Sequence, residues 1–171
     1  MRGLLVLAGL VAAGLAASPA EAQLEGFVNG AGGIAVGIND DLAHGSGASW
    51  AVQGQAGLNL SRFVVGGELA QFQPTTDRKV KVFGAFFRIA AFADRPVRPY
   101  LVTGLGAYRY SAAGDSRTSI GGSVGPGALF QLRGSPLSFL LEARFHTTFD
   151  RQPGLNTQQF LAILAGAELH F

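Results

Sequence analysis

The sequence predicts an all-β fold: an eight-stranded antiparallel transmembrane β-barrel that follows an N-terminal signal peptide. Three observations lead to this prediction. Segments that alternate in polarity with a period of two recur along the chain and end in turn-forming residues. Charged residues make up only 14% of the 171 residues, while 25 residues are glycine, which suits strands with one face toward lipid. Aromatic residues gather near the ends of these segments.

Residues 1–22 are expected to form a secretory signal peptide. Met1-Arg2 is a short basic region, residues 3–17 are an uninterrupted run of Leu, Val, Ala and Gly, and Ala20-Glu21-Ala22 matches a cleavage pattern. The alternative is a membrane anchor, but the run is shorter than the roughly 20 residues that a helical span needs. The barrel domain should then occupy residues 23–171, which hold no cysteine and therefore no disulfide.

The first four expected strands follow the signal peptide. Residues 24–37 are glycine-rich, so their facing is ambiguous. Residues 49–60 oppose an apolar face to one that carries glutamine and asparagine, and a tight turn leads into residues 63–73, which alternate in the same way. Residues 79–92 place one face with Phe83, Ala85, Phe87 and Ile89 against another with Val82, Gly84, Phe86 and Arg88. The second, third and fourth segments therefore have the period of a strand with two different faces.

Four further strands are expected at residues 98–110, 118–132, 137–149 and 160–171. Pro126 removes a backbone donor, so a bulge or local distortion is expected there. The last segment has the clearest termination, because it ends on an aromatic residue that would suit a membrane interface. The connections after the second, fourth and sixth strands are short and the others longer, which places both chain ends at a short-turn, periplasmic rim.

The facing of the strands decides between a membrane barrel and a soluble, lipocalin-like barrel, which would turn its apolar face inward. Few charges lie on the polar faces, whereas an exterior facing water should carry many. The aromatic residues near strand ends predict two girdles at the membrane interfaces. The predicted girdle residues are Trp50, Phe63, Tyr100, Tyr108, Tyr110, Phe130, Phe139, Phe149 and Phe171.

The inward face is expected to hold a network of ionisable side chains. Its predicted members are Glu68, Arg88, Arg109, Glu142, Arg144, His146 and Glu168. The interior of an eight-stranded barrel is only just wide enough for side chains, and buried carboxylates there must pair with cations or become neutral. The favoured interpretation is a Glu/Arg plug, and a narrow ion or proton path through the same residues is the alternative.

An enzyme that acts on lipid A is a further alternative, for which His146, Thr148 and Glu142 are the candidate residues. Lipid A deacylases place a His/Ser/Glu set toward lipid, whereas His146 is expected inside and Thr148 stands where a serine would be needed. We therefore expect no enzyme activity, no cofactor and no metal site. The net charge of +2 is too small to indicate nucleic-acid binding.

Three stretches resemble the small outer-membrane β-barrel domain family of Gram-negative bacteria, which has an OmpA-type plan. They are Arg98-Pro99-Tyr100-Leu101-Val102-Thr103-Gly104-Leu105-Gly106-Ala107-Tyr108, Glu142-Ala143-Arg144-Phe145-His146-Thr147, and the closing strand with Phe171. The resemblance covers the whole mature chain and implies a monomer in the cell outer membrane with a structural or surface-interaction role. The expected partners are membrane lipid, lipopolysaccharide and the barrel assembly machinery, which would bind the strand that ends at Phe171.

Overall fold

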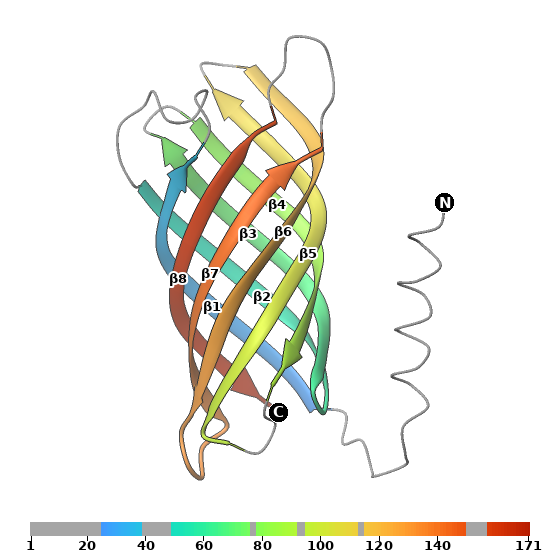
Figure 1. Ribbon diagram of the computed structural model, residues 1–171, viewed down its shortest axis with the longest axis vertical. Coiled ribbons are helices and arrows are strands. Elements are labelled where there is room, and N and C mark those ends of the chain that lie inside the picture. Colours follow the sequence, from blue (N-terminus) through green and yellow to red (C-terminus); the bar gives the residue numbers. More distant parts are fainter. Residues whose placement is uncertain (1–24, 39–48, 76–77, 92–94, 113–114, 150–156) are drawn as a thin grey trace, which may run out of the picture.

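The computed structural model describes residues 25–38, 49–75, 78–91, 95–112, 115–149 and 157–171. These residues form a closed antiparallel barrel (Figure 1), which confirms the predicted fold. Its strands are β1 (Glu25–Gly37), β2 (Ser49–Leu60), β3 (Phe63–Thr75), β4 (Arg78–Ala90), β5 (Val97–Ala112), β6 (Asp115–Gln131), β7 (Leu137–Thr148) and β8 (Gln159–His170). The predicted signal peptide lies outside the described residues. The described part of the chain has no helix with the length and hydropathy to cross a membrane.

Pairing between the first and last strands closes the barrel. Val28 lies opposite Leu169, and beyond the strand end Gly26 and Phe171 exchange backbone hydrogen bonds of 2.8 and 2.9 Å. Figure 1 shows that β1 begins and β8 ends at the same rim. The closing strand therefore satisfies the backbone donors and acceptors of β1, which would otherwise form an open sheet edge.

The strand bounds agree with the expected ones to within three residues, and the largest difference lies in the β5–β6 hairpin. Its ladder extends to the pair Ala112 and Asp115, so only residues 113–114 separate the two strands. Residues 76–77 alone separate β3 from β4. The expectation of longer connections after the third and fifth strands was therefore wrong, because the strands themselves continue through the polar residues. The connections after β1, β3, β5 and β7 share the rim opposite the chain ends, which we call the loop end. Of these four, the connections after β1 and β7 are the long ones.

Two prolines interrupt the ladder in different ways. Pro126 keeps its place opposite Leu101 of β5, while pairing of β6 with β7 stops at Val124 and resumes at Gly127 in the same register. The expected distortion is thus a gap in the ladder and not a bulge, because proline has no N–H to donate. The register shift lies between Phe72 and Thr75 of β3, where the chain contains Pro74.

The outer surface of the barrel is apolar. Large side chains from several strands point away from the bore, and Leu69, Phe83, Leu105 and Ile120 are 63–70% exposed. A continuous apolar exterior of this kind is unfavourable in water and favourable in the hydrocarbon of a bilayer. The charged side chains Arg88, Glu142, Arg144 and Glu168 are fully buried instead. This inversion is the arrangement of a membrane barrel and excludes the soluble, lipocalin-like alternative.

Candidate functional site in the barrel interior

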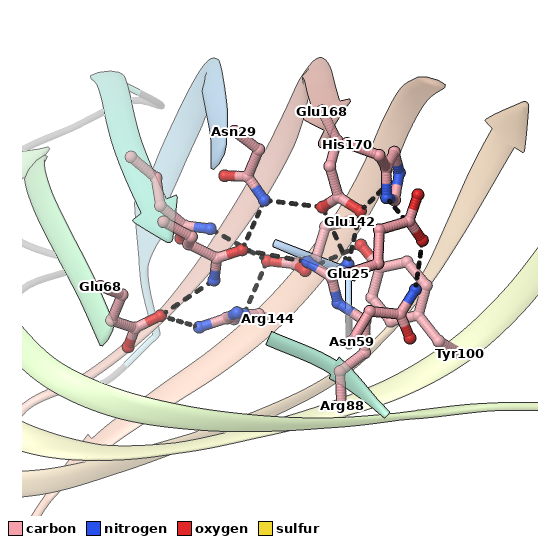
Figure 2. A network of polar contacts seen from close by, with 12 residues as sticks. Glu25, Asn29, Asn59, Glu68, Arg88, Tyr100, Glu142, Arg144, Glu168 and His170 are labelled. Carbon is pink, nitrogen blue, oxygen red and sulfur yellow. Dashed lines mark hydrogen bonds and ion pairs between the residues drawn. The ribbon is translucent and has the colours of Figure 1, made fainter. Parts of the chain in front are cut away.

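One arginine contacts two glutamates inside the barrel and forms a triad with them (Figure 2). Nη1 of Arg144 donates a hydrogen bond of 2.5 Å to Oε2 of Glu68, and Nε of Arg144 lies 2.6 Å from Oε1 of Glu142. Neighbouring positions of β7 supply Arg144 and Glu142, whereas Glu68 comes from β3. One guanidinium group therefore links opposite walls of the barrel.

A second ion-paired group, Arg88 with Glu168, lies nearer the rim that holds the chain ends. Nη1 of Arg88 donates to both carboxylate oxygens of Glu168, at 3.2 and 2.9 Å. The guanidinium carbon of Arg88 also lies 4.5 Å from the ring centroid of Tyr100 and 5.4 Å from that of Phe27. Aromatic faces stabilise a desolvated guanidinium group, so the rings contribute to holding this charge inside the barrel.

Amide side chains join the two ion-paired groups into one network. Gln55 accepts hydrogen bonds from Arg88 and Asn29 at 3.1 and 2.8 Å, and its Nε2 donates to Glu68 at 3.2 Å. Asn29 also donates to Glu168 at 3.0 Å. The predicted network did not include these amides. Their positions on the polar face of β1 and β2 were the available signal, because the period of two aligns them with the charged residues.

Tyr100 is a further member of the network, and its predicted place in an outer girdle was wrong. Its hydroxyl donates a hydrogen bond of 2.9 Å to Oε2 of Glu142, and the side chain is only 5% exposed. Gly127 of β6 lies directly opposite, and a Cβ atom there would overlap the Tyr100 ring. The absence of a side chain at Gly127 therefore gives the ring room inside the barrel.

The inward and outward faces of β5 are the reverse of those predicted. The reversal also changes the positions of Tyr108, Tyr110 and Arg109. Tyr108 is buried in the bore, over Gly121 of β6, and Tyr110 is partly buried against the core. Arg109, which was predicted to be inside, is exposed and donates to Oγ of Ser116 at 3.3 Å. Successive strand residues point to opposite faces, so the inward tyrosines necessarily turn Arg109 outward.

The bore is aromatic between the charged network and the loop end. The His146 ring stacks on Phe160, with centroids 4.6 Å apart and planes 5° apart, and lies 4.8 Å from Phe72. Nδ1 of His146 and the hydroxyl of Tyr108 are 3.0 Å apart. Among the described residues no carboxylate is within hydrogen-bonding distance of His146. The contacts that a catalytic His/carboxylate pair requires are therefore not formed at this histidine.

The structure places the six other predicted girdle residues on the outside of the barrel. All are at least 36% exposed: Trp50, Phe63, Phe130, Phe139, Phe149 and Phe171. Phe171 is the most exposed of them, at 74%, beside the rim that holds the chain ends. Their positions near strand ends fit aromatic side chains at membrane interfaces.

The network holds more carboxylates than guanidinium groups. Its buried members are three glutamates, at 68, 142 and 168, and two arginines, at 88 and 144. His170 lies at the edge of the network, with Nε2 3.3 Å from Oε1 of Glu168 and Nδ1 3.7 Å from Oε2 of Glu25. Tyr100 and the amides supply the remaining hydrogen bonds, as buried charged groups require.

Comparison with known proteins places this architecture among membrane barrels. No protein-family model and no curated protein matches the chain. The crystal structure of neisserial surface protein A (NspA) is similar, with a TM-score of 0.72 and 20% identity over 85% of this chain and 97% of that one. The N-terminal β-barrel domain of Pseudomonas aeruginosa OprF has a TM-score of 0.60 and 10% identity over 87% of this chain and 100% of that one.

Strand number, antiparallel closure and overall shape agree with both structures, and the apolar exterior gives an independent physical reason for a membrane setting. The chain therefore has the fold of the eight-stranded outer-membrane β-barrels of Gram-negative bacteria.

Proposed function

We propose that this protein is a closed barrel of the bacterial outer membrane with a structural or surface-interaction role, and that its bore does not conduct. The observation that carries the proposal is the complete burial of side chains at successive depths of the bore. Arg88, Arg144, Phe72 and Phe160 are each at most 1% exposed. Bulk water does not reach side chains buried to this degree, and ions need water or equivalent ligands to pass.

The two halves of the bore resist opening for different reasons. The ion pair of Arg144 with Glu68 joins β7 to β3 across the barrel, and Glu142 of β7 contacts the same guanidinium group. Separating these groups would leave buried charges unpaired. The rings of Phe72, His146 and Phe160 pack on one another, and moving them would sacrifice apolar contact. A solute path would have to disrupt both layers, which supports the plug over the pore.

Recording from planar bilayers tests this proposal directly. The purified, folded protein should give no single-channel steps in salt solution at any applied voltage that the bilayer tolerates. A combined Phe72→Ala and Phe160→Ala variant keeps the charged network and serves to show whether the aromatic layer contributes to closure. Steady, ion-selective steps from the wild-type protein would refute the plug and establish the pore instead.

We also propose that the protein is not an enzyme. His146 is buried inside the barrel, where an acyl chain in the surrounding membrane cannot reach it, and Thr148 accepts a hydrogen bond of 3.1 Å from the backbone of Gln158. Lipid A from cells with and without the protein should therefore have the same mass spectrum. A mass difference that disappears in a His146→Phe variant would contradict this.

The proposed partners are membrane lipid, lipopolysaccharide and the barrel assembly machinery. The outward apolar side chains carry the lipid contact, and the closing strand β8 with Phe171 offers the segment for assembly. A Phe171→Ala variant should accumulate less folded protein in the outer membrane of cells, measured as the heat-modifiable band on a gel. The same variant refolded from urea into detergent should give a normal yield, because assembly inside cells is the step affected.

A further inference from the structure

The outward face of β4 and β5 carries a cluster of cations near the loop end. Lys81 lies directly opposite Arg109 in the β4–β5 ladder, and Lys79 lies two residues away along β4, opposite Ser111. All three basic side chains are exposed. Because β5 turns its tyrosines inward, Arg109 lies on the same outer face as the two lysines. We call Lys79, Lys81 and Arg109 the basic patch.

The basic patch lacks a counter-charge in the described part of the chain. Arg109 reaches the hydroxyl of Ser116, but no described carboxylate forms an ion pair with any of the three side chains. Like charges that lie directly opposite each other in a ladder destabilise the sheet. An anion between Lys81 and Arg109 would remove this repulsion.

The basic patch begins where the apolar exterior ends. One row of laterally paired residues across β3 to β6 contains Leu69, Phe83, Ala107 and Ile120. The next row on the same face, two residues closer to the loop end, contains Gln71, Lys81, Arg109 and Thr118. Leu69, Phe83 and Ile120 are 63–70% exposed. Two residues of a strand span roughly 7 Å. The cations therefore lie directly beside exposed apolar side chains, on the side toward the loop end.

On the outward faces of the described strands, adjacent basic side chains lie on one side of the barrel, over β4 and β5. Within their described residues, the outward positions of β1, β2, β7 and β8 carry no charged side chain. At the opposite rim the exposed arginines lie in the connections and not above an apolar strand face: Arg62, Arg95 and Arg133. Among the described residues, only the basic patch therefore combines adjacent cations with a lipid-facing surface directly below them.

We propose that the basic patch binds the phosphate group of a phosphorylated glycolipid of the lipid A class, whose acyl chains lie along Phe83 and the apolar row. The inference rests on the proposed outer-membrane location, which puts the loop end in the outer leaflet. The aliphatic stems of Lys79 and Lys81 can follow the apolar surface while their amines extend to the headgroup. Arg109 can offer two N–H donors to phosphate oxygens, and hydrogen bonds between charged groups are the stronger ones.

Native mass spectrometry of the folded protein in detergent, titrated with bis-phosphorylated lipid A, tests the site. The variant Lys79→Gln, Lys81→Gln, Arg109→Gln removes the basic patch. The matched control Arg62→Gln, Arg95→Gln, Arg133→Gln removes the same charge at the other rim. We expect the basic-patch variant to retain at most about one tenth of the lipid A that the wild type retains. The control should retain an amount within about twofold of the wild-type amount. Free inorganic phosphate at the same concentration should not displace the lipid, because it lacks acyl chains.

Several outcomes would overturn the site. They are equal lipid A retention by the basic-patch variant and the wild type, equal losses in the patch variant and the control, or displacement by inorganic phosphate. A heat-modifiable gel shift verifies folding, and the smaller variant Lys81→Gln, Arg109→Gln replaces the triple variant should that one not fold. Failure of the wild-type protein to insert into bilayers would refute the proposed location. An inserted barrel that binds lipid A independently of the basic patch would refute only this site.

Discussion

At the scale of single residues, the barrel interior depends on Arg144, whose single guanidinium group forms ion pairs with two carboxylates. Its guanidinium group lies within 2.5 Å of Glu68 and 2.6 Å of Glu142, and it is fully buried. Removing one partner of a buried ion pair costs far more than removing the whole set, because an uncompensated charge stays in a low-dielectric interior. This asymmetry allows the network to be tested by comparison of variants.

Arg144→Met should lower the free energy of unfolding by about 3–5 kcal/mol, because both glutamates lose their cation. Urea titration of the protein folded in lipid vesicles measures the change. The matched triple variant Glu68→Gln, Glu142→Gln, Arg144→Met leaves no charge at the site and should lose less than the single variant. Equal losses in both would show that volume and not charge determines the effect.

Tyr100→Phe should cost about 1–3 kcal/mol, because the carboxylate of Glu142 loses a hydrogen bond in a buried position. The same urea titration measures it. A double-mutant cycle with Glu142→Gln separates this bond from the loss of the hydroxyl itself. If the two substitutions are additive, the 2.9 Å contact contributes no coupling energy and this assignment is wrong.

At the scale of strands, the sequence predicts facing wherever the two faces differ clearly in polarity. β7 shows this best, since Phe139 and Leu141 point outward while Glu142 and Arg144 are buried. β5 shows the limit of the pattern. A tyrosine suits both a membrane interface and a polar bore, and the feature that selects the bore is a glycine on the neighbouring strand. That pairing is known only once the register is known.

The position of a residue along a strand should determine how costly a charge is on its outer face. Leu141→Arg puts a cation at mid-strand, where it should cost about 2–4 kcal/mol, and Leu137→Arg puts one beside the turn, where it should cost about 0–1 kcal/mol. Both residues lie on the outward face of β7. Unfolding titrations in vesicles compare them. Equal costs at the two positions would contradict the proposed depth of the strand in the bilayer.

At the scale of the whole molecule, closure converts local alternation into a division between lipid and bore. The sequence predicts the barrel because every strand must satisfy this division. It does not predict which charges meet. Arg88 and Glu168 are 80 residues apart, and they meet because tilt and stagger bring β4 and β8 to one depth. The amides of Gln55 and Asn29 were missed for the same reason, since only the assembled bore shows which polar residues are neighbours.

The central claim is that the apolar faces of the strands contact lipid while the bore is closed. The chain contains no cysteine, so the single-cysteine variants Leu141→Cys, Phe145→Cys and, on the inward face, Leu140→Cys report on one position each. In bilayers, nitroxide labels at 141 and 145 should collide more with oxygen than with a water-soluble nickel complex. The thiol of the Leu140→Cys variant should react with an aqueous maleimide only after unfolding. Greater access of the nickel complex at 141 and 145, together with rapid labelling of the Leu140→Cys variant in the folded barrel, would contradict the claim.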